Sequence, residues 1–412
     1  MQTENRCRFC RQNLHFTFVD LGMSPLCESY VNVEQLNMME PFYPLHVHVC
    51  ENCFLVQLEE YVDPQNIFTE YAYFSSYSND WLKHAENYVE MATTRFRLDQ
   101  SSLVVEVASN DGYLLQYFVA RGVPALGIEP ARNVAEVALQ KGVPTRMEFF
   151  GEKTAQLLAA EGQSADLLLG NNVLAQVPDI NDFVKGMKIL LKPDGVITME
   201  FPHLMRLMAE NQFDTIYHEH FSYFSFITAE KIFAAHGLTM FDVEALPTHG
   251  GSLRIFARHS ENASREVSPR VHELRACEEV AGITRLDSYG DFTENVKETK
   301  RKLLDFLILA KREGKRIAGY GAPGKGNTLL NYCGIRTDFV DFTVDRNPYK
   351  QGKFLPGTHI PIYGPEKIKE TRPDYLLILP WNFRDEIMAQ NAYIHDWGGK
   401  FVIPIPEVTI LP

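Results

Sequence analysis

VVEVASNDGYLLQYF, residues 104–118, shows the pattern from which the fold class follows. A short apolar run ends in a tight turn that reaches Gly112, and a helical pattern comes directly after it. Similar apolar runs lie at 125–130, 165–170 and 195–200. Short buried runs that alternate with helices are typical of a parallel, doubly wound sheet. The sequence therefore predicts an α/β protein.

Two further units flank this sheet. Residues 1–60 contain two Cys-x-x-Cys pairs, several aromatics and turn residues, and no long helical pattern, which indicates a small module held by a metal. Residues 260–315 have the mixed charges of a solvated helix, and strands are expected after them at 316–321, 339–345 and 375–380. The expected domains are a four-cysteine module at 1–70, the doubly wound domain at 71–260 and a Rossmann-like α/β domain at 261–412.

Length, composition and charge restrict the class of protein. The 412 residues exceed one ordinary core and favour two or three domains. No apolar run approaches the roughly 18 residues of a membrane-spanning helix, and the polar start MQTENRCRFC lacks the apolar core of a secretion signal. The net charge of −13 argues against a nucleic-acid partner. We expect a cytoplasmic monomer without nucleic-acid or membrane partners.

Four of the seven cysteines form two close pairs, Cys7 with Cys10 and Cys50 with Cys53. Four thiolates can close a tetrahedral shell and leave no open position for chemistry, so the pairs predict a structural zinc. The long gap between the two pairs is unusual for a zinc ribbon. Unpaired buried thiols and a thioredoxin-like redox pair are the alternatives, and the redox pair lacks the βαβ context that such motifs need.

Other histidines and cysteines in the chain are interpreted as structural. His46 and His48 lie close to the second cysteine pair, yet four thiolates already satisfy a zinc ion. Cys27, Cys277 and Cys333 have no partner at a useful spacing, and we expect them in the core.

Polar residues end several of the expected strands. Glu106 lies in the first, Glu129 ends the next, and Asn171 and Asn172 end another. Ligands of doubly wound sheets bind outside the carboxyl ends of the strands, where Gly112 permits close approach of the backbone. Glu129 is placed to accept hydrogen bonds from both ribose hydroxyls of an adenosine.

These elements, in this order, resemble class I S-adenosylmethionine methyltransferases. The first motif departs from the usual pattern, because Ala108 and Asn110 occupy positions that often hold glycine. Asn110 is included in the expected cofactor site with the residues above. A nucleotide-binding fold with another ligand is the alternative.

Residues 213–225, FDTIYHEHFSYFS, bring Tyr217, His218, Glu219 and His220 together. On a loop, three or four of these side chains could line one cavity. Histidine suits a base that works near neutral pH, since its ordinary pKa is about 6.5. A metal site and a set of satisfied structural polar groups are the alternatives, and the HExxH spacing of a metal-binding helix is missing.

The segments CRFC, FVDLGMSPLCESY, CENCFLVQL, YAYFSSYS, LGIEPA, NNVLAQVPD, YHEHFSYFS, LPTHGGSLR and GYGAPGKGNTLLNYC occur in order along nearly the whole chain. Together they resemble the zinc-containing sugar C-methyltransferases of deoxysugar pathways. Such enzymes methylate C3, or in some members another carbon, of a nucleotide-linked 4-keto-deoxysugar.

The resemblance implies roles for individual residues. His220 would be the base, with Glu219 beside it and Tyr217 and Tyr71 lining the sugar site. Tyr73 and Ser75, in the same segment as Tyr71, are assigned to substrate binding. One departure is Gln176, which stands where close relatives have a histidine.

The expected chemistry explains these residue types. A carbon beside a ketone loses its proton because the negative charge moves onto the carbonyl oxygen. The enzyme needs a base for the carbon and hydrogen-bond donors for the oxygen. His220 would take the proton, while Tyr71, Tyr217 or Gln176 would stabilise the enolate.

The C-terminal unit contains Gly319-x-Gly321-x-x-Gly324, and Asp345 follows about 20 residues later, which matches a dinucleotide-binding fingerprint. Within the resemblance, this domain binds the nucleotide of the sugar substrate. Gly321, Lys325, Asn327 and Asp345 are the expected contacts, and Lys325 could add charge at the phosphates. NAD binding and a purely structural glycine turn are the alternatives.

Two other functions remain open at this stage. One is an NAD-dependent sugar-nucleotide oxidoreductase or epimerase built on the C-terminal fingerprint. The other is a zinc-ribbon interaction module on an inactive methyltransferase fold. His249, in LPTHGGSLR, is interpreted either as structural or as a phosphate contact.

Overall fold

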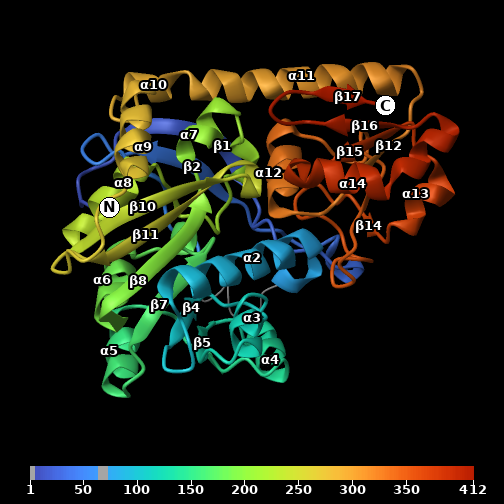
Figure 1. Ribbon diagram of the computed structural model, residues 1–412. Coiled ribbons are helices and arrows are strands. Elements are labelled where there is room, and N and C mark those ends of the chain that lie inside the picture. The colour runs from blue at the N-terminus through green and yellow to red at the C-terminus, as the bar shows by residue number, and fades with distance from the viewer. Residues whose placement is uncertain (1–4, 64–72) are drawn as a thin grey trace.

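The computed structural model describes residues 5–63 and 73–412, whose strands form three sheets (Figure 1). The central sheet has the order β10-β11-β8-β7-β4-β5-β6. The strands from β4 to β8 are parallel, whereas β11 is antiparallel to both of its neighbours. The strands are β4 (Val104–Val107), β5 (Ala125–Ile128), β6 (Thr145–Arg146), β7 (Ala165–Asn171), β8 (Leu191–Pro202), β10 (Leu238–Leu246) and β11 (Ser252–His259).

Helices cover both faces of this sheet, as the doubly wound pattern predicts. Alternate residues of β4 point to opposite faces: Val104 packs with Trp81 and Phe118 of one helical layer, and Val105 with Phe183 of the other. The first layer contains α2 (Asn79–Phe96) and α3 (Leu115–Ala120), and the second contains α5 (Glu152–Ala160), α6 (Ile180–Leu190) and α8 (Phe226–Ala235). Helices α4 (Arg132–Gln140) and α7 (Leu204–Ala209) complete the domain.

The N-terminal unit is built on a small antiparallel sheet of the order β1-β2-β3-β9. Its strands are β1 (Phe16–Ser24), β2 (Tyr43–Val49), β3 (Val56–Leu58) and β9 (Ser222–Tyr223). Strand β9 comes from the middle of the chain, directly after the YHEHF segment, and pairs with β3 through Val56 and Tyr223. The N-terminal unit is therefore joined to the central domain by backbone hydrogen bonds next to the expected catalytic loop.

The C-terminal sheet has the order β14-β13-β12-β15-β16-β17, parallel except for β17. Its strands are β12 (Ile317–Tyr320), β13 (Thr343–Val344), β14 (Ile362–Tyr363), β15 (Tyr375–Ile378), β16 (Lys400–Ile403) and β17 (Thr409–Leu411). Its helices are α12 (Gly324–Cys333), α13 (Glu366–Thr371) and α14 (Arg384–Gln390). The parallel strands, from β14 to β16 in this order, have the strand order of a Rossmann-like unit.

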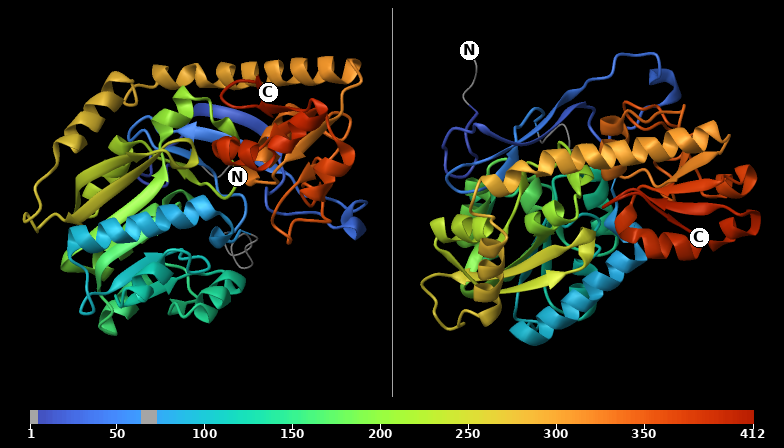
Figure 2. Two further views of the ribbon diagram at one scale, coloured as in Figure 1. Left: turned by 45° about the vertical axis from the view of Figure 1, so that its right-hand side comes forward. Right: turned by 90° about the horizontal axis from the view of Figure 1, so that it is seen from above.

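Three helices connect the central and C-terminal sheets: α9 (Pro269–Val280), α10 (Asp287–Gly290) and α11 (Phe292–Arg312). Helix α11 runs along one side of the molecule and covers both the N-terminal strands and the C-terminal sheet (Figure 2). It buries Val296, Leu303 and Leu307 and keeps its charged residues outward, as the mixed-charge pattern predicts.

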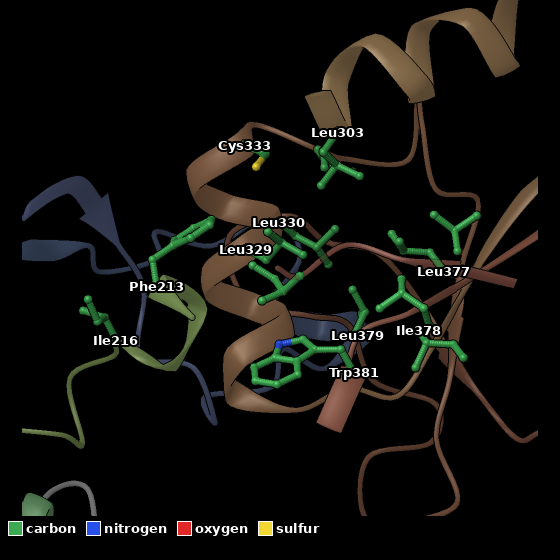
Figure 3. Packing of buried hydrophobic residues seen from close by; sticks show 14 of the residues in the cluster. Phe213, Ile216, Leu303, Leu329, Leu330, Cys333, Leu377, Ile378, Leu379 and Trp381 are labelled. Atoms are coloured by element: carbon green, nitrogen blue, oxygen red, sulfur yellow. The ribbon is translucent and has the colours of Figure 1, made fainter. Parts of the chain in front are cut away.

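A single hydrophobic core joins the three units. Helix α12 lies between Phe213 and Ile216 of the central domain on one side and Leu377 and Leu379 of the C-terminal sheet on the other (Figure 3). Phe18 of β1 belongs to the same buried cluster. A close-packed core resists relative movement, so the three units are held in fixed positions relative to one another.

The expected domain boundaries stay predictions. The first, at 70/71, falls outside the described residues, and the second follows β11. Within residues 5–63 and 73–412, no helix combines the length and apolar character needed to cross a bilayer.

Candidate active site and zinc centre

The four paired cysteines converge in space as predicted. Their sulfur atoms all lie within 4.8 Å of one another, and the closest pairs, Cys7 with Cys53 and Cys10 with Cys50, are 3.5 Å apart. A tetrahedral zinc with Zn–S bonds of about 2.3 Å requires sulfur atoms about 3.8 Å apart. The four thiolates therefore fit one zinc ion.

Neighbouring polar groups support this cluster. Gln57 Nε2 donates to Cys7 Sγ over 3.2 Å, and Gln57 Oε1 accepts from the Arg8 backbone N–H over 2.8 Å. Asn181 Nδ2 donates to the carbonyls of Arg8 and Phe9 over 3.0 Å. The zinc centre is thus attached to α6 of the central domain, close to one wall of the cavity described next.

One cavity of about 680 Å³ connects all three units. The ends of the central strands, the YHEHF loop and the glycine loop after β12 all line it. Its volume is within the range of small-molecule sites. Most of the expected cofactor, catalytic and nucleotide residues therefore lie around one space.

The turn after β4 has the backbone conformation that glycine favours, although only one of its residues is glycine. Ala108, Asn110 and Gly112 have φ values of 57°, 49° and 74°. The left-handed region costs a residue with Cβ roughly 1–2 kcal/mol, and asparagine tolerates it better than most. The departure from the usual glycines thus leaves the turn itself in place, and Ala108 and Asn110 both line the cavity.

Glu129 lines the cavity at the end of β5 and is oriented by two backbone groups. Its Oε2 accepts from Asn110 N over 2.9 Å, and its Oε1 accepts from Ala131 N over 2.8 Å. Burial raises the pKa of Glu129 to about 7, against the lowering effect of these two hydrogen bonds. Each oxygen retains a lone pair for a further donor.

Two expected cofactor residues, Glu106 and Gly112, are not among the described residues that line the cavity. Glu106 is fully buried in β4, where burial raises its pKa well above the ordinary value. A Cβ on Gly112 would lie 3.0 Å from Val143, so this glycine is required by packing. Any effect of either residue on the cofactor is indirect, through the turn that they support.

Asn171, the last residue of β7, and Asn172, directly after it, both line the cavity. Asn171 Nδ2 donates to the Tyr113 hydroxyl over 3.3 Å, and Asn172 Nδ2 donates to Nε2 of His249 over 2.8 Å. Asn172 has a φ of 56°, in the left-handed region that asparagine tolerates better than most residues.

The YHEHF segment is a loop, and His220 is directed into the cavity. Its Nδ1 lies 2.9 Å from the Thr215 carbonyl. A carbonyl can only accept, so the ring proton is on Nδ1 and Nε2 has a free lone pair. Nε2 makes no hydrogen bond to any described residue. Burial, together with the nearby charge of Lys325, lowers the pKa of His220 to about 4.

The neighbours of His220 divide between the cavity and the core. Tyr217 and Glu219 line the cavity, and the Tyr217 ring lies 4.1 Å from that of His220. His218 points to the N-terminal unit, where Nε2 lies 3.1 Å from the Pro44 carbonyl. Gln176 lines the cavity, whereas Tyr71 lies outside the described residues.

The expected substrate contacts mostly lie in the cavity. Tyr73, Ser75, Gly321, Lys325 and Asp345 line it. Asn327 does not belong to the described lining and is buried within α12, where its carbonyl oxygen accepts from Asn331. Its expected contact with the nucleotide therefore has no direct support from the geometry.

The loop after β12 is supported from two sides. Asp345 Oδ2 accepts from Ala322 N over 2.7 Å, which holds the loop against β13. Lys350 Nζ and the Tyr30 hydroxyl both donate to the Ala322 carbonyl. The first residues of α12 thus face the cavity with their amide N–H groups unpaired by the helix.

Sequence reasoning missed several lining residues. Trp81 of α2 stacks on Tyr113, with ring centroids 5.9 Å apart, and Glu28 and Lys350 meet across the boundary between the N- and C-terminal units at 3.7 Å. Only the tertiary fold brings these positions together. The one available signal was the amphipathic pattern of 79–96, which predicts a buried face for Trp81 but no cavity.

The fold and site define a class I methyltransferase with a structural zinc. The sheet has its last strand, β11, inserted antiparallel between β8 and β10, and the acid after β5 and the turn after β4 face one cavity. This is the arrangement that binds S-adenosylmethionine in this class, and the four thiolates bind zinc.

Comparison with known proteins agrees with this class. Three family models match, described as "Putative zinc binding domain" over residues 7–68, "Methyltransferase domain" over 81–243 and "C-methyltransferase C-terminal domain" over 247–406. The C-methyltransferase NovU of Streptomyces niveus is 36% identical over 407 residues, which cover 99% of this chain and 97% of that protein. The chain therefore belongs to the C-methyltransferase family that its motifs resemble, and it is an S-adenosylmethionine-dependent methyltransferase.

More distant similarities are confined to part of the chain. A ubiquinone biosynthesis O-methyltransferase of Bartonella tribocorum is 25% identical over 95 residues, covering 23% of this chain and 38% of that protein. The solved structure of magnesium protoporphyrin IX methyltransferase (ChlM) from Synechocystis PCC 6803 with bound SAM is 15% identical, with a TM-score of 0.34 over 43% of this chain and 79% of that chain.

Replacing Glu129 tests the cofactor end of the cavity. Glu129→Ala should weaken S-adenosylmethionine binding by about 1–3 kcal/mol, the range for hydrogen bonds to a charged group. Because the pKa of Glu129 is raised to about 7, wild-type cofactor affinity should also fall as the pH drops below that value. Calorimetry at two pH values measures both effects. Unchanged affinity in Glu129→Ala would remove this residue from the site.

Proposed function

We propose that the protein transfers a methyl group from S-adenosylmethionine to a carbon beside the ketone of a nucleotide diphosphate-linked 4-keto-6-deoxyhexose, at C3, in deoxysugar biosynthesis. The observation that supports this is the cavity itself, which Glu129, His220 and Lys325 all line. A methyl acceptor that reaches from His220 to the loop after β12 would need a group to bind at each end. We propose that the enzyme acts as a cytoplasmic monomer.

The part of the cavity lined by the loop after β12 and the start of α12 suits a diphosphate. The N-terminus of α12 offers backbone N–H groups and a partial positive charge to an anion. Lys325 projects from this first turn, lies over the Trp381 ring at 4.8 Å and donates to Asn382 Oδ1 over 2.7 Å. These contacts fix the ammonium group beside the helix N-terminus, where it would neutralise a phosphate.

The part of the cavity lined by the YHEHF loop suits the removal of a proton from carbon. Nε2 of His220 is unprotonated and would take the proton, while the hydrogen bond from Nδ1 to Thr215 holds the ring and stabilises the imidazolium. The Tyr217 hydroxyl or the Gln176 amide would donate to the enolate oxygen, and both line the cavity. S-adenosylmethionine supplies an electrophilic methyl group on its sulfonium. The closed four-thiolate zinc has a structural role, since it has no open ligand position.

The family match also bears on the alternatives. The glycine fingerprint lies in residues matched as a C-methyltransferase C-terminal domain, and this supports nucleotide-sugar binding over an NAD-dependent oxidoreductase. An inactive methyltransferase fold is not supported either, since His220 and Glu129 face the same cavity.

The rate should have limits on both sides of neutral pH. His220 acts as a base only when neutral, so kcat/KM should fall as the pH drops toward its pKa of about 4. Burial lowers the pKa of Lys325 to about 8, and Asp214 opposes this. Because the diphosphate needs the ammonium form, substrate affinity should weaken as the pH rises through about 8.

A Lys325→Gln variant distinguishes the origin of the alkaline limit. It should bind substrate weakly at every pH and lose that limit in KM, because no charge remains to titrate at this position. An alkaline limit that persists unchanged in Lys325→Gln would assign it to another group.

The proposed function is tested by incubating the enzyme and labelled S-adenosylmethionine with a panel of nucleotide 4-keto-6-deoxy sugars. Each is paired with the same sugar reduced to the 4-hydroxyl, which cannot form an enolate. Mass analysis should show one added methyl group on a keto sugar and none on its reduced partner. Equal methylation of both members of a pair would contradict the proposed chemistry.

A further inference from the structure

The turn Thr248–Gly250 holds His249 in a backbone conformation that its side chain disfavours. His249 has φ 54° and ψ 22°, in the left-handed region that residues with a Cβ disfavour. Such conformations persist where the surroundings enforce them, and they cluster at functional sites. The contacts of this turn therefore decide what His249 can do.

Hydrogen bonds fix the turn on both sides of His249. The Thr248 hydroxyl donates to Glu200 Oε1 over 2.8 Å, and Gln212 Nε2 donates to the Gly250 carbonyl over 2.8 Å. Gly250 leaves no room for adjustment, because a Cβ there would lie 2.6 Å from the Trp381 ring. The turn is thus fixed by groups from the central and C-terminal units.

The His249 imidazole is directed into the cavity and has a defined tautomer. The imidazole lines the cavity. It makes an edge contact with the Trp81 ring, and the two ring centroids are 5.2 Å apart. Asn172 Nδ2 lies 2.8 Å from His249 Nε2. An amide nitrogen can only donate, so Nε2 accepts and the ring proton is on Nδ1. Nδ1 makes no hydrogen bond to a described residue, which leaves its N–H for a ligand.

His249 lies on the same cavity as the base. Burial lowers the pKa of His249 to about 3, and the charges that Lys325 and His220 can carry act in the same direction, while Glu200 opposes them. The imidazole is therefore neutral at working pH. A neutral ring is poorly suited to a phosphate contact, which favours the imidazolium, but it can donate one hydrogen bond to a forming oxyanion.

We infer that His249 is a second imidazole of the reaction centre, which donates a hydrogen bond from Nδ1 to the oxygen of the enolate that His220 generates. This inference rests on the proposed function. In the step, the proton leaves the substrate carbon for Nε2 of His220. The C–H electron pair becomes the carbon–carbon double bond, and the carbonyl π pair moves onto the oxygen. His249 keeps its proton and stabilises the added charge.

The test uses His249→Gly and His249→Asn, because glycine and asparagine accept the left-handed backbone and neither adds strain. His249→Gly removes the donor and should lower kcat by about 10²–10³-fold, the usual cost of losing one oxyanion donor. Calorimetry should show nearly unchanged affinity for S-adenosylmethionine and for the keto sugar nucleotide. Added imidazole should restore part of the turnover of His249→Gly, and His249→Asn, with a shorter donor, should fall between.

Nitrogen-15 NMR of the histidine rings tests the geometry without turnover. The His249 signals should show a neutral ring with the proton on Nδ1. A proton on Nε2 would overturn the inference, as would near-wild-type kcat in His249→Gly or a loss of cofactor affinity that accounts for the whole rate loss. Wild-type enzyme that methylates no keto sugar would refute the proposed function instead, and the ring tautomer would then still be measured independently.

Discussion

His220→Ala should lose most of its turnover, by about 10²–10⁴-fold in kcat, while it still binds both substrates. The reason is geometric. The Thr215 carbonyl holds the proton of His220 on Nδ1, so Nε2 is the unprotonated nitrogen that the cavity presents to a substrate carbon. Glu219 lies in the same loop and also lines the cavity, and its Oε1 accepts from the Cys27 thiol over 3.4 Å.

The matched control is His218→Ala. His218 is two residues away and equally polar, yet its ring contacts the Pro44 carbonyl and not the cavity. The His218→Ala variant should be somewhat less stable than wild type and should keep most of its turnover. Solvent exchange adds a direct readout, because wild type in deuterium oxide should exchange the proton beside the ketone and His220→Ala should not. Near-wild-type turnover of His220→Ala would defeat the assignment and move attention to Glu219.

Loss of zinc should unfold the N-terminal unit. Structural zinc contributes about 10–16 kcal/mol of apparent binding free energy in zinc-finger peptides, far more than a few small strands can supply. Purified protein should contain about one zinc per chain, and a chelator should produce a separate unfolding transition at lower temperature. Cys50→Ser should act in the same direction, because three thiolates leave the shell open.

Loss of zinc should also lower activity, because residues beside the first cysteine pair contact the cavity wall. Arg8 donates to the Pro178 carbonyl, and Asn181 donates back to the Arg8 carbonyl, next to Gln176 in the cavity wall. Metal-free protein should therefore lose methyl transfer together with the N-terminal fold. Cys277→Ser is the control. The prediction that Cys277 lies in the core is wrong, because its side chain is exposed on α9, and it is not part of the four-cysteine cluster. Fully stable, active, zinc-free enzyme would contradict this account.

Local pattern predicted the elements of the fold well where one segment contains the whole signal. The strand, turn and helix of 104–118 have that arrangement, and the cysteine pairs meet as four thiolates require. The expected strand at 339–345 is only Thr343–Val344, because the residues before it form a turn after α12. The pairing of β3 with β9 could not be predicted, since it joins short segments far apart in the chain.

The sequence predicted which residues lie near the site, but it did not predict which of their side chains line the cavity. Glu106 and Gly112 belong to the cofactor turn by sequence, yet one is buried in the strand and the other packs on Val143. His249 gave no sequence signal for its role, because the backbone angle and the contact with Asn172 depend on the tertiary fold. The same holds for Lys350, whose pairing with Glu28 crosses between two units.

The proposed reaction forms a new carbon–carbon bond beside the ketone, and the position of the transferred methyl group shows whether this bond forms. The enzyme is given S-adenosylmethionine labelled with carbon-13 in the methyl group and a nucleotide 4-keto-6-deoxy sugar, and the product is examined by NMR. We predict that the labelled methyl is bonded to the carbon next to the carbonyl, with that carbon's hydrogen lost. A labelled methyl bonded to oxygen, or no label in any keto sugar while the protein binds S-adenosylmethionine, would contradict the account.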